Sequence, residues 1–262
     1  MHNFDYHRPT SLADAAKRLS GEAKLVAGGM TLIPTLKQRL AQPSSLVDLG
    51  GIAELRGIKP EGGGLTIGAM TTHAEVAHSA EVKKTIPALA VLAEGIGDPQ
   101  VRNRGTIGGS ISNNDPAADY PAGLVALGAT VITDKRRIAA DDFFKGMFET
   151  ALQDGEIVTA VSFPRPDKAA YMKFPNPASR YAMVGVFVAR TGGGIRVAVT
   201  GAGPGVFRAT EMEKALAGNF SADAIKSVKI PAAGLNSDMH GSAEYRAHLV
   251  NVMARRAVTA CS

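Results

Sequence analysis

Two pairs of adjacent glycines stand at positions where main-chain amides could bind an anion. Gly28 and Gly29 follow a short apolar run and precede Thr31, at the head of an expected helix. A strand that leads through a glycine-rich turn into a helix directs free N–H groups and the positive end of the helix dipole to one point. This arrangement suits a phosphate group.

The second pair, Gly108 and Gly109, stands between Thr106 and Ser110. Here we predict a loop that turns into a short apolar strand, with glycines that allow a positive φ and a close approach of a ligand. Successive N–H groups in such a turn form a concave anion site. One glycine pair is weak evidence, because most such pairs form only turns. Two pairs from distant parts of the chain could hold a pyrophosphate from both sides, as a dinucleotide requires.

Four segments carry a more specific pattern: Val26-Ala27-Gly28-Gly29, Asp98-Pro99-Gln100-Val101-Arg102-Asn103, Thr106-Ile107-Gly108-Gly109 and Asp115-Pro116-Ala117-Ala118-Asp119. In this order and spacing they resemble the FAD-binding medium subunits of molybdenum hydroxylases. That family includes the flavoprotein subunit of aerobic carbon monoxide dehydrogenase and the flavin domain of xanthine dehydrogenase. The resemblance covers most of the chain, although its specific motifs all lie before Tyr120.

The resemblance implies an α+β fold in which a PCMH-type FAD-binding domain of two subdomains precedes a smaller C-terminal flavoprotein domain, made of a sheet plus helices. We place the first domain at residues 1–165, with subdomains at about 1–55 and 56–165, and the second at 166–262. The segment Pro164-Arg165-Pro166-Asp167 is the best candidate for the linker.

The resemblance also implies the cofactor-binding residues. One half of the pyrophosphate site would be Ala27, Gly28, Gly29, Met30 and Thr31, and the other half Thr106, Ile107, Gly108, Gly109 and Ser110. Relatives commonly carry Gln or His in place of Met30, and Asn or Asp in place of Ser110. Neither change removes a main-chain donor.

Further contacts to the flavin are implied at Ile96, Asn113, Asp119, Ile157, Lys173 and Tyr181. Asp119 could instead be a plain helix N-cap, or could fill both roles. On the sequence alone we favour a core position for both Ile96 and Ile157. Tyr181 could stack on the isoalloxazine ring, and a cation at Lys173 would stabilise reduced, anionic flavin. Arg102 and Arg104 are candidates for phosphate binding or for structural ion pairs, and we favour a structural role for at least one of them.

Residue patterns predict the elements that position these groups. Expected helices are 10–19, 32–40, 72–76, 87–94, 120–127, 209–216, 222–227 and 243–260. Expected strands are 24–27, 45–49, 65–68, 129–133, 156–163, 171–174, 184–190 and 195–201. His73 and His78 miss the i, i+4 spacing of a helical zinc pair, so we expect solvated surface histidines. Asp141 and Asp142 are expected to cap a helix.

Composition limits the function classes. The chain has 262 residues, 45% of them hydrophobic, and a net charge of +5. Basic residues are scattered and tryptophan is absent, so no nucleic-acid-binding stripe is expected. No apolar run approaches the roughly 20 residues of a membrane span, and we see no signal peptide. Cys261 is the only cysteine, which excludes an internal disulfide or a cysteine-ligated iron–sulfur cluster, and cytoplasmic residence is the default expectation.

By this resemblance the chain is an electron-transfer subunit that holds FAD. A large partner would carry molybdopterin and hydroxylate the substrate, a small partner would relay electrons through [2Fe-2S] clusters, and the FAD would pass them to an external acceptor such as NAD or oxygen. The first alternative is a stand-alone FAD-dependent oxidase or dehydrogenase, which would need its own acid or base beside the flavin. The second is a scaffold subunit that has lost flavin.

Overall fold

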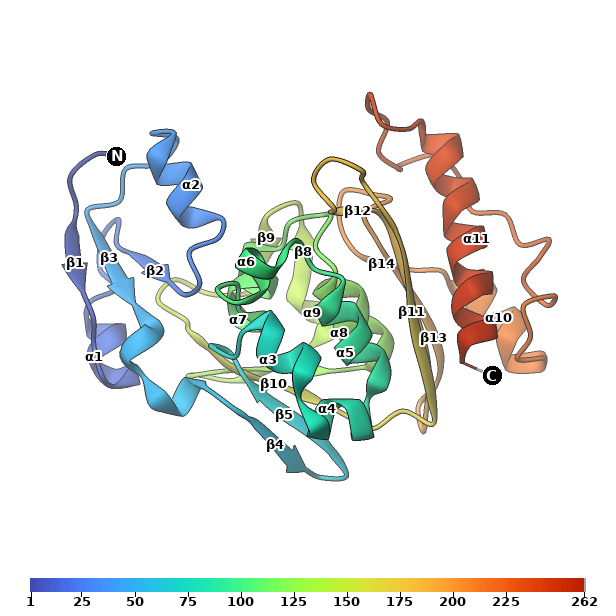
Figure 1. Ribbon diagram of the computed structural model, residues 1–262, viewed down its shortest axis with the longest axis horizontal. Coiled ribbons are helices and arrows are strands. Elements are labelled where there is room, and N and C mark those ends of the chain that lie inside the picture. Colours follow the sequence, from blue (N-terminus) through green and yellow to red (C-terminus); the bar gives the residue numbers. More distant parts are fainter. Residues whose placement is uncertain (262) are drawn as a thin grey trace.

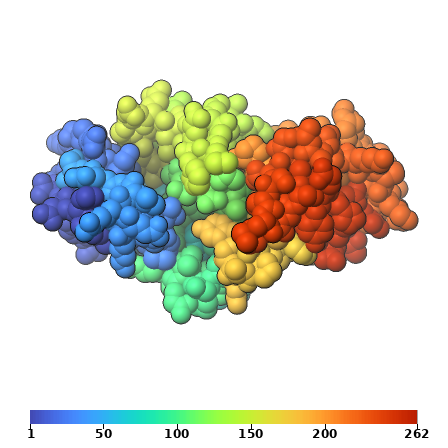
Figure 2. Space-filling model, turned by 90° about the horizontal axis from the view of Figure 1, so that it is seen from above, coloured from blue at the N-terminus to red at the C-terminus, as the bar shows by residue number. Residues whose placement is uncertain are grey.

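The computed structural model describes residues 1–261, which form three parts arranged in line (Figure 1). The N-terminal part lies at one end of the elongated molecule, and the C-terminal sheet and its helices lie at the other. Figure 2 shows the same order from above, with the middle part between the two ends.

The N-terminal part is a parallel sheet of three short strands with two helices. Its elements are β1 (Asp5–His7), α1 (Leu12–Lys17), β2 (Lys24–Val26), α2 (Leu32–Lys37) and β3 (Ser45–Asp48), and the strand order is β1-β3-β2. Strand β3 pairs in parallel with both neighbours, so the expected β-α-β arrangement is confirmed. Strand β1 was not predicted, because it is short and mostly exposed. Two 3-10 turns, η1 (Leu49–Gly51) and η2 (Ala53–Leu55), lead into the middle part.

The middle part has an antiparallel sheet of five strands in the order β4-β5-β10-β6-β7. These strands are β4 (Ile58–Glu61), β5 (Gly64–Gly68), β6 (Thr130–Thr133), β7 (Arg137–Ala139) and β10 (Val158–Phe163). Its helices are α3 (His73–His78), α4 (Ala80–Thr85), α5 (Pro87–Glu94), α6 (Pro99–Arg102), α7 (Ile107–Asn113), α8 (Tyr120–Leu127) and α9 (Ala140–Phe143). A small hairpin, β8 (Phe144–Gly146) with β9 (Glu149–Thr150), follows α9.

The C-terminal part is an antiparallel sheet covered by helices. Its elements are β11 (Lys168–Pro175), β12 (Ala182–Thr191), β13 (Gly194–Thr200), β14 (Phe207–Arg208), α10 (Thr210–Gly218) and α11 (Ala243–Ala260). The expected hairpin of β12 and β13 is confirmed, as is the long last helix. The expected helix over residues 222–227 is wrong. That segment forms turns, although Ile225 is buried.

Helix α8 joins the middle and C-terminal parts because it is apolar on all sides. All eight of its residues are buried, and it packs against β12 and β13 as well as α5 and α7. Phe187 of β12 and Tyr171 of β11 belong to the same hydrophobic core as Leu124 of α8. A helix that is hydrophobic all round must be covered on every face, so α8 requires the C-terminal sheet.

The acidic pair Asp141 and Asp142 does not cap a helix. Both residues lie in the first turn of α9 without a side-chain cap bond, and the Asp141 carboxylate lies 2.8 Å from a guanidinium nitrogen of Arg196 on β13. This ion pair also ties the middle part to the C-terminal sheet. Among residues 1–261, no helix has the length and apolar character needed to cross a membrane.

The ends of β6 and β10 are joined by a buried carboxylate. Glu156 accepts hydrogen bonds from Arg136 Nε at 2.9 Å, from the Gln153 N–H at 2.8 Å and from the Thr133 hydroxyl at 2.7 Å. The Arg136 guanidinium contributes most to lowering the pKa of Glu156 to about 2, and burial of the carboxyl opposes this shift. The carboxylate form is therefore strongly favoured in the folded chain.

Because the pKa of Glu156 is lower in the folded chain than in the unfolded chain, its stabilising contribution is complete above about pH 4.5 and is lost as the pH falls towards 2. We expect Glu156→Gln to lower the free energy of unfolding by about 2 kcal/mol at pH 7 and by almost nothing at pH 2. Urea unfolding across this range measures the difference. Glu22→Gln, at an exposed position, is the control. A gap between wild type and Glu156→Gln that does not vary with pH would contradict the assignment.

Candidate functional site

A cleft of about 830 Å³ opens between the N-terminal part, the middle part and one loop of the C-terminal sheet. Most of the residues predicted to bind a cofactor line it: Ala27, Gly28, Gly29, Met30, Thr31, Ile96, Thr106, Gly108, Gly109, Ser110, Asn113, Asp119, Ile157 and Tyr181. Ile107 and Lys173 do not. Ile107 is fully buried in the core of the middle part, and Lys173 lies behind Asp119. The volume is within the range typical of ligand and cofactor sites.

The two glycine pairs lie side by side although they are far apart in the sequence. A Cβ atom on Gly28 would stand 2.0 Å from the main-chain oxygen of Arg104, and a Cβ atom on Gly109 would stand 3.5 Å from the Cβ atom of Ala27. Only glycine fits at position 28, because a side chain there would overlap the main chain before α7. The N-terminal part therefore meets the middle part through the backbones of these two turns.

The first glycine pair presents free main-chain donors to the cleft. Gly29 has a φ of 75°, so the chain turns sharply between β2 and α2. Within residues 1–261, the N–H groups of Gly28, Gly29, Met30 and Thr31 have no acceptor in the protein. Consecutive unpaired amides in a glycine turn form a concave site for an anion. These residues fit the pyrophosphate of a dinucleotide.

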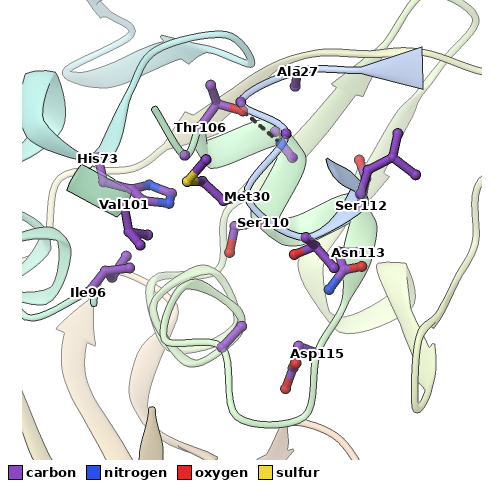
Figure 3. A pocket seen from close by; sticks show the side chains of 18 of the residues that line it. Ala27, Met30, His73, Ile96, Val101, Thr106, Ser110, Ser112, Asn113 and Asp115 are labelled. Carbon is purple, nitrogen blue, oxygen red and sulfur yellow. Dashed lines mark hydrogen bonds between the residues drawn. The ribbon is translucent and has the colours of Figure 1, made fainter. Parts of the chain in front are cut away.

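The second glycine pair differs from the sequence expectation. It lies in the first turn of helix α7 rather than in a loop and strand, and neither glycine has a positive φ. The Ile107 N–H donates to Thr71 O at 3.1 Å, and the Gly108 N–H donates to Ala69 O at 2.9 Å. The Gly109 N–H donates to the Thr106 hydroxyl at 3.1 Å (Figure 3). Since these amides are already paired, α7 offers the cleft mainly the side chains of Thr106, Ser110, Ser112 and Asn113.

Asp119 connects the cleft with the C-terminal sheet. It precedes α8, but its side chain makes no cap bond. Its carboxylate instead accepts the Tyr171 hydroxyl at 2.5 Å and Lys173 Nζ at 3.0 Å, and the same Nζ donates to Gly95 O at 2.9 Å. Burial raises the pKa of Asp119, and the Lys173 ammonium and Tyr171 hydroxyl oppose that effect. Lys173 thus acts on the site through Asp119, and the alternative in which the Asp119 side chain only caps the helix is wrong.

Tyr181 borders the cleft from a loop between β11 and β12. Asn176 fixes this loop through two kinds of bond. Its side-chain oxygen accepts hydrogen bonds from the Ala178 and Ser179 amides, and its main-chain N–H donates to Tyr181 O. The Tyr181 ring remains 47% exposed although it borders the cleft. Burial, together with the charge of Asp115, raises the pKa of Tyr181, so this phenol stays neutral. An exposed aromatic ring at the edge of a cleft is available to stack on a planar ligand.

Ile157, Ile96 and Arg102 have structural roles, whereas the side chain of Arg104 is exposed. Ile157 is 1% exposed, belongs to the core below the cleft, and its N–H donates to the Asp134 side chain at 2.8 Å. Ile96 is partly buried against the core of the middle part. Arg102 donates to Ile96 O and Gly97 O, and it pairs with Glu94, so it shapes the wall rather than facing a phosphate.

Sequence reasoning missed several polar groups of the cleft, among them Ser112, Glu156 and His73. His73, expected on the solvated surface, is only 4% exposed and lines the cleft, whereas His78 on the same helix is exposed and pairs with Glu94. The Thr72–Glu75 capping box explains why α3 begins at His73. That signal places the helix start correctly, but the burial of His73 depends on its contact with Gly105.

Comparison with known proteins agrees with this geometry. Residues 2–166 match the family described as the FAD binding domain in molybdopterin dehydrogenase, and residues 169–261 match the CO dehydrogenase flavoprotein C-terminal domain. The chain belongs to this family. It is the FAD-binding subunit of an oxidoreductase of the molybdenum hydroxylase type.

Relatives match over nearly the whole length. The carbon monoxide dehydrogenase medium chain of Hydrogenophaga pseudoflava is 35% identical, over 98% of this chain and 96% of the relative. The nicotine 6-hydroxylase medium subunit of Paenarthrobacter nicotinovorans is 36% identical over 97% and 95%. The xanthine dehydrogenase FAD-binding subunit of Escherichia coli O157:H7 is 29% identical over 97% and 94%.

Solved structures show the same fold. Carbon monoxide dehydrogenase from Hydrogenophaga pseudoflava matches with a TM-score of 0.89 and 37% identity, over 99% of this chain and 97% of the other. Quinoline 2-oxidoreductase from Pseudomonas putida 86 matches with a TM-score of 0.89 and 30% identity over the same shares.

The contact at Gly28 allows a direct test of how the cleft is built. We expect Gly28→Ala to lower the free energy of unfolding by about 2–3 kcal/mol, because the new methyl group would overlap Arg104 O. FAD affinity should fall as well, since the amides of the first turn would move. Gly218→Ala is the control, because a Cβ there meets no atom within 4 Å. Equal stability and FAD affinity for the two variants would contradict a close contact at Gly28.

The buried Asp119–Lys173 pair allows a double-mutant cycle. We expect Lys173→Met to destabilise the chain by about 3 kcal/mol, because it leaves the Asp119 carboxylate buried without its cation. Adding Asp119→Asn should recover most of that loss, since a neutral amide needs no counter-charge. Urea unfolding of the wild type, both single variants and the double variant measures the coupling energy. If the loss of stability in the double variant equals the sum of the losses in the two single variants, Asp119 and Lys173 are not coupled.

Proposed function

We propose that the cleft holds the whole FAD molecule and that this chain passes electrons from the iron–sulfur clusters of a small partner subunit to an external acceptor. The substrate would be hydroxylated at molybdenum in a large molybdopterin-binding partner. The bound FAD supplies the redox chemistry, and the chain binds, orients and shields it.

The observation that carries this proposal is the row of unpaired amides at Gly28, Gly29, Met30 and Thr31. In the proposed complex with FAD, the pyrophosphate lies against this row of amides. Ser110 and Asn113 of α7 supply polar side chains to the same cleft (Figure 3). Met30 contributes through its main chain, because a thioether cannot donate a hydrogen bond.

The flavin end of the cofactor is assigned to the side of the cleft that faces the C-terminal sheet. Tyr181 offers an exposed ring there, and Asp119 offers a carboxylate held by Tyr171 and Lys173. A rigid carboxylate and an aromatic ring on separate elements can fix the plane of a heterocycle. On this basis the FAD-binding domain spans residues 1–165, with subdomains at about 1–55 and 56–165, and the C-terminal domain at 166–262 completes the flavin end.

The cysteine content of this chain and the names of its relatives support the assignment of the other cofactors to partner subunits. The sequence holds one cysteine, Cys261, whereas an iron–sulfur cluster needs several thiolate ligands, so clusters must lie in another chain. Two relatives are named as a medium chain and a medium subunit, which agrees with a larger and a smaller partner. We assign the complex to the cytoplasm.

Removing FAD from the native complex tests this role. In the deflavinated complex, substrate should still reduce the iron–sulfur clusters, as seen by electron paramagnetic resonance, while transfer to the external acceptor should fall at least tenfold. Adding FAD should restore transfer and bind at one molecule per chain. Substrate turnover by the isolated FAD-loaded chain would instead indicate a stand-alone oxidase or dehydrogenase, and a chain that binds no FAD would indicate a scaffold.

A further inference from the structure

His73 has a buried imidazole ring at the wall of the cleft, and no contact within the chain uses the hydrogen-bonding capacity of that ring. It begins α3, where its N–H donates to Gly105 O at 3.0 Å. The ring stands beside Ile96 and Val101 and is directed towards the cleft (Figure 3). It also packs against Tyr120, the residue after Asp119, with 5.4 Å between the ring centroids. His73 therefore lies near the part of the cleft that adjoins the C-terminal sheet.

The His73 side chain forms no hydrogen bond with any residue in the described chain. Its Nδ1 is enclosed and unpaired, and the neighbouring Tyr120 hydroxyl is enclosed and unpaired as well. A buried polar atom without a partner costs roughly 1–3 kcal/mol, and such atoms are rare in folded proteins. A leucine of similar size would avoid this cost, so packing alone does not account for a histidine here.

Gly105 lies beside Nε2, the ring nitrogen of His73 on the side of the cleft. Gly105 and His73 both line the cleft, and a Cβ on Gly105 would stand 2.6 Å from His73 Nε2. Gly105 has no positive φ, so its backbone conformation does not require glycine. The missing side chain instead leaves room for Nε2 at the wall. Because Nδ1 is enclosed, Nε2 is the nitrogen that a bound molecule can reach.

We propose that His73 Nε2 hydrogen-bonds the uncharged flavin half of FAD, its ribityl hydroxyls or ring edge, and so acts as a specificity-determining residue of the cleft. The inference rests on FAD occupying the cleft as proposed above. Burial, together with the charge of Arg102, lowers the pKa of His73 to about 4, so the imidazole is neutral near pH 7. A neutral ring suits a hydroxyl or carbonyl better than a phosphate, and the apolar neighbours Ile96 and Val101 agree with a flavin surface.

The test compares three probes on the full-length apoprotein: FAD, riboflavin as the flavin half, and ADP as the pyrophosphate half. We expect His73→Leu to weaken FAD and riboflavin by about tenfold and to leave ADP unchanged. His73→Gln, which keeps a donor and an acceptor, should recover part of the loss. His78→Leu, on the exposed side of the same helix, is the matched control.

The melting temperature of each apoprotein separates ligand binding from a structural role. Because His73→Leu removes unpaired buried nitrogens, its apoprotein should melt at the same temperature as wild type or higher. Gly105→Ala should displace Nε2 and weaken riboflavin as His73→Leu does, and combining the two variants should weaken it no further.

Unchanged riboflavin affinity in His73→Leu, or an equal loss of ADP affinity, overturns the inference while the proposed function stands. If the His73→Leu apoprotein melts at a lower temperature and loses flavin affinity to a matching degree, His73 has a structural role. That result would also overturn the inference. A wild-type chain that binds no FAD refutes the proposed function itself, and the inference with it.

Discussion

The cleft depends on one backbone contact, between the glycine turn after β2 and the segment before α7. No side chain fits between Gly28 and the Arg104 carbonyl. This approach brings the row of free amides from the N-terminal part next to the start of α7, whose polar side chains line the same cleft. The N-terminal sheet has only three short strands, so its position depends on such contacts with the middle part.

A second set of contacts fixes the other side of the cleft. Asp119, Tyr171 and Lys173 come from two parts of the chain, and Lys173 also reaches the main chain of Gly95. A buried carboxylate held by a cation and a phenol cannot rotate freely, so these contacts hold the start of α8 against strand β11. The loop fixed by Asn176 then places Tyr181 above the same region. Side chains held by these bonds therefore form the side of the cleft proposed for the flavin ring. Main-chain amides form the side proposed for the charged pyrophosphate.

Local patterns predicted much of this arrangement. The glycine turn after β2, the β-α-β unit, the β12–β13 hairpin and the last helix follow from residue spacing. Most of the site residues that the family resemblance implied line the cleft. Helix α7 was not predicted, because Ile-Gly-Gly-Ser-Ile contains poor helix formers. Its start is imposed by Thr106 as N-cap and by the carbonyls of Thr71 and Ala69, which accept its first amides. Likewise, the burial of His73 and the pairing of Lys173 depend on residues tens of positions away.

Helix α8 has a consequence for how the chain can be divided. The two family segments meet near residues 166 and 169, yet Leu124 and Phe187, on either side of that boundary, share one hydrophobic core. A gene shortened at this boundary would encode a fragment whose α8 exposes a wholly apolar surface to water, and such surfaces promote aggregation. The boundary in sequence is therefore not a boundary in folding.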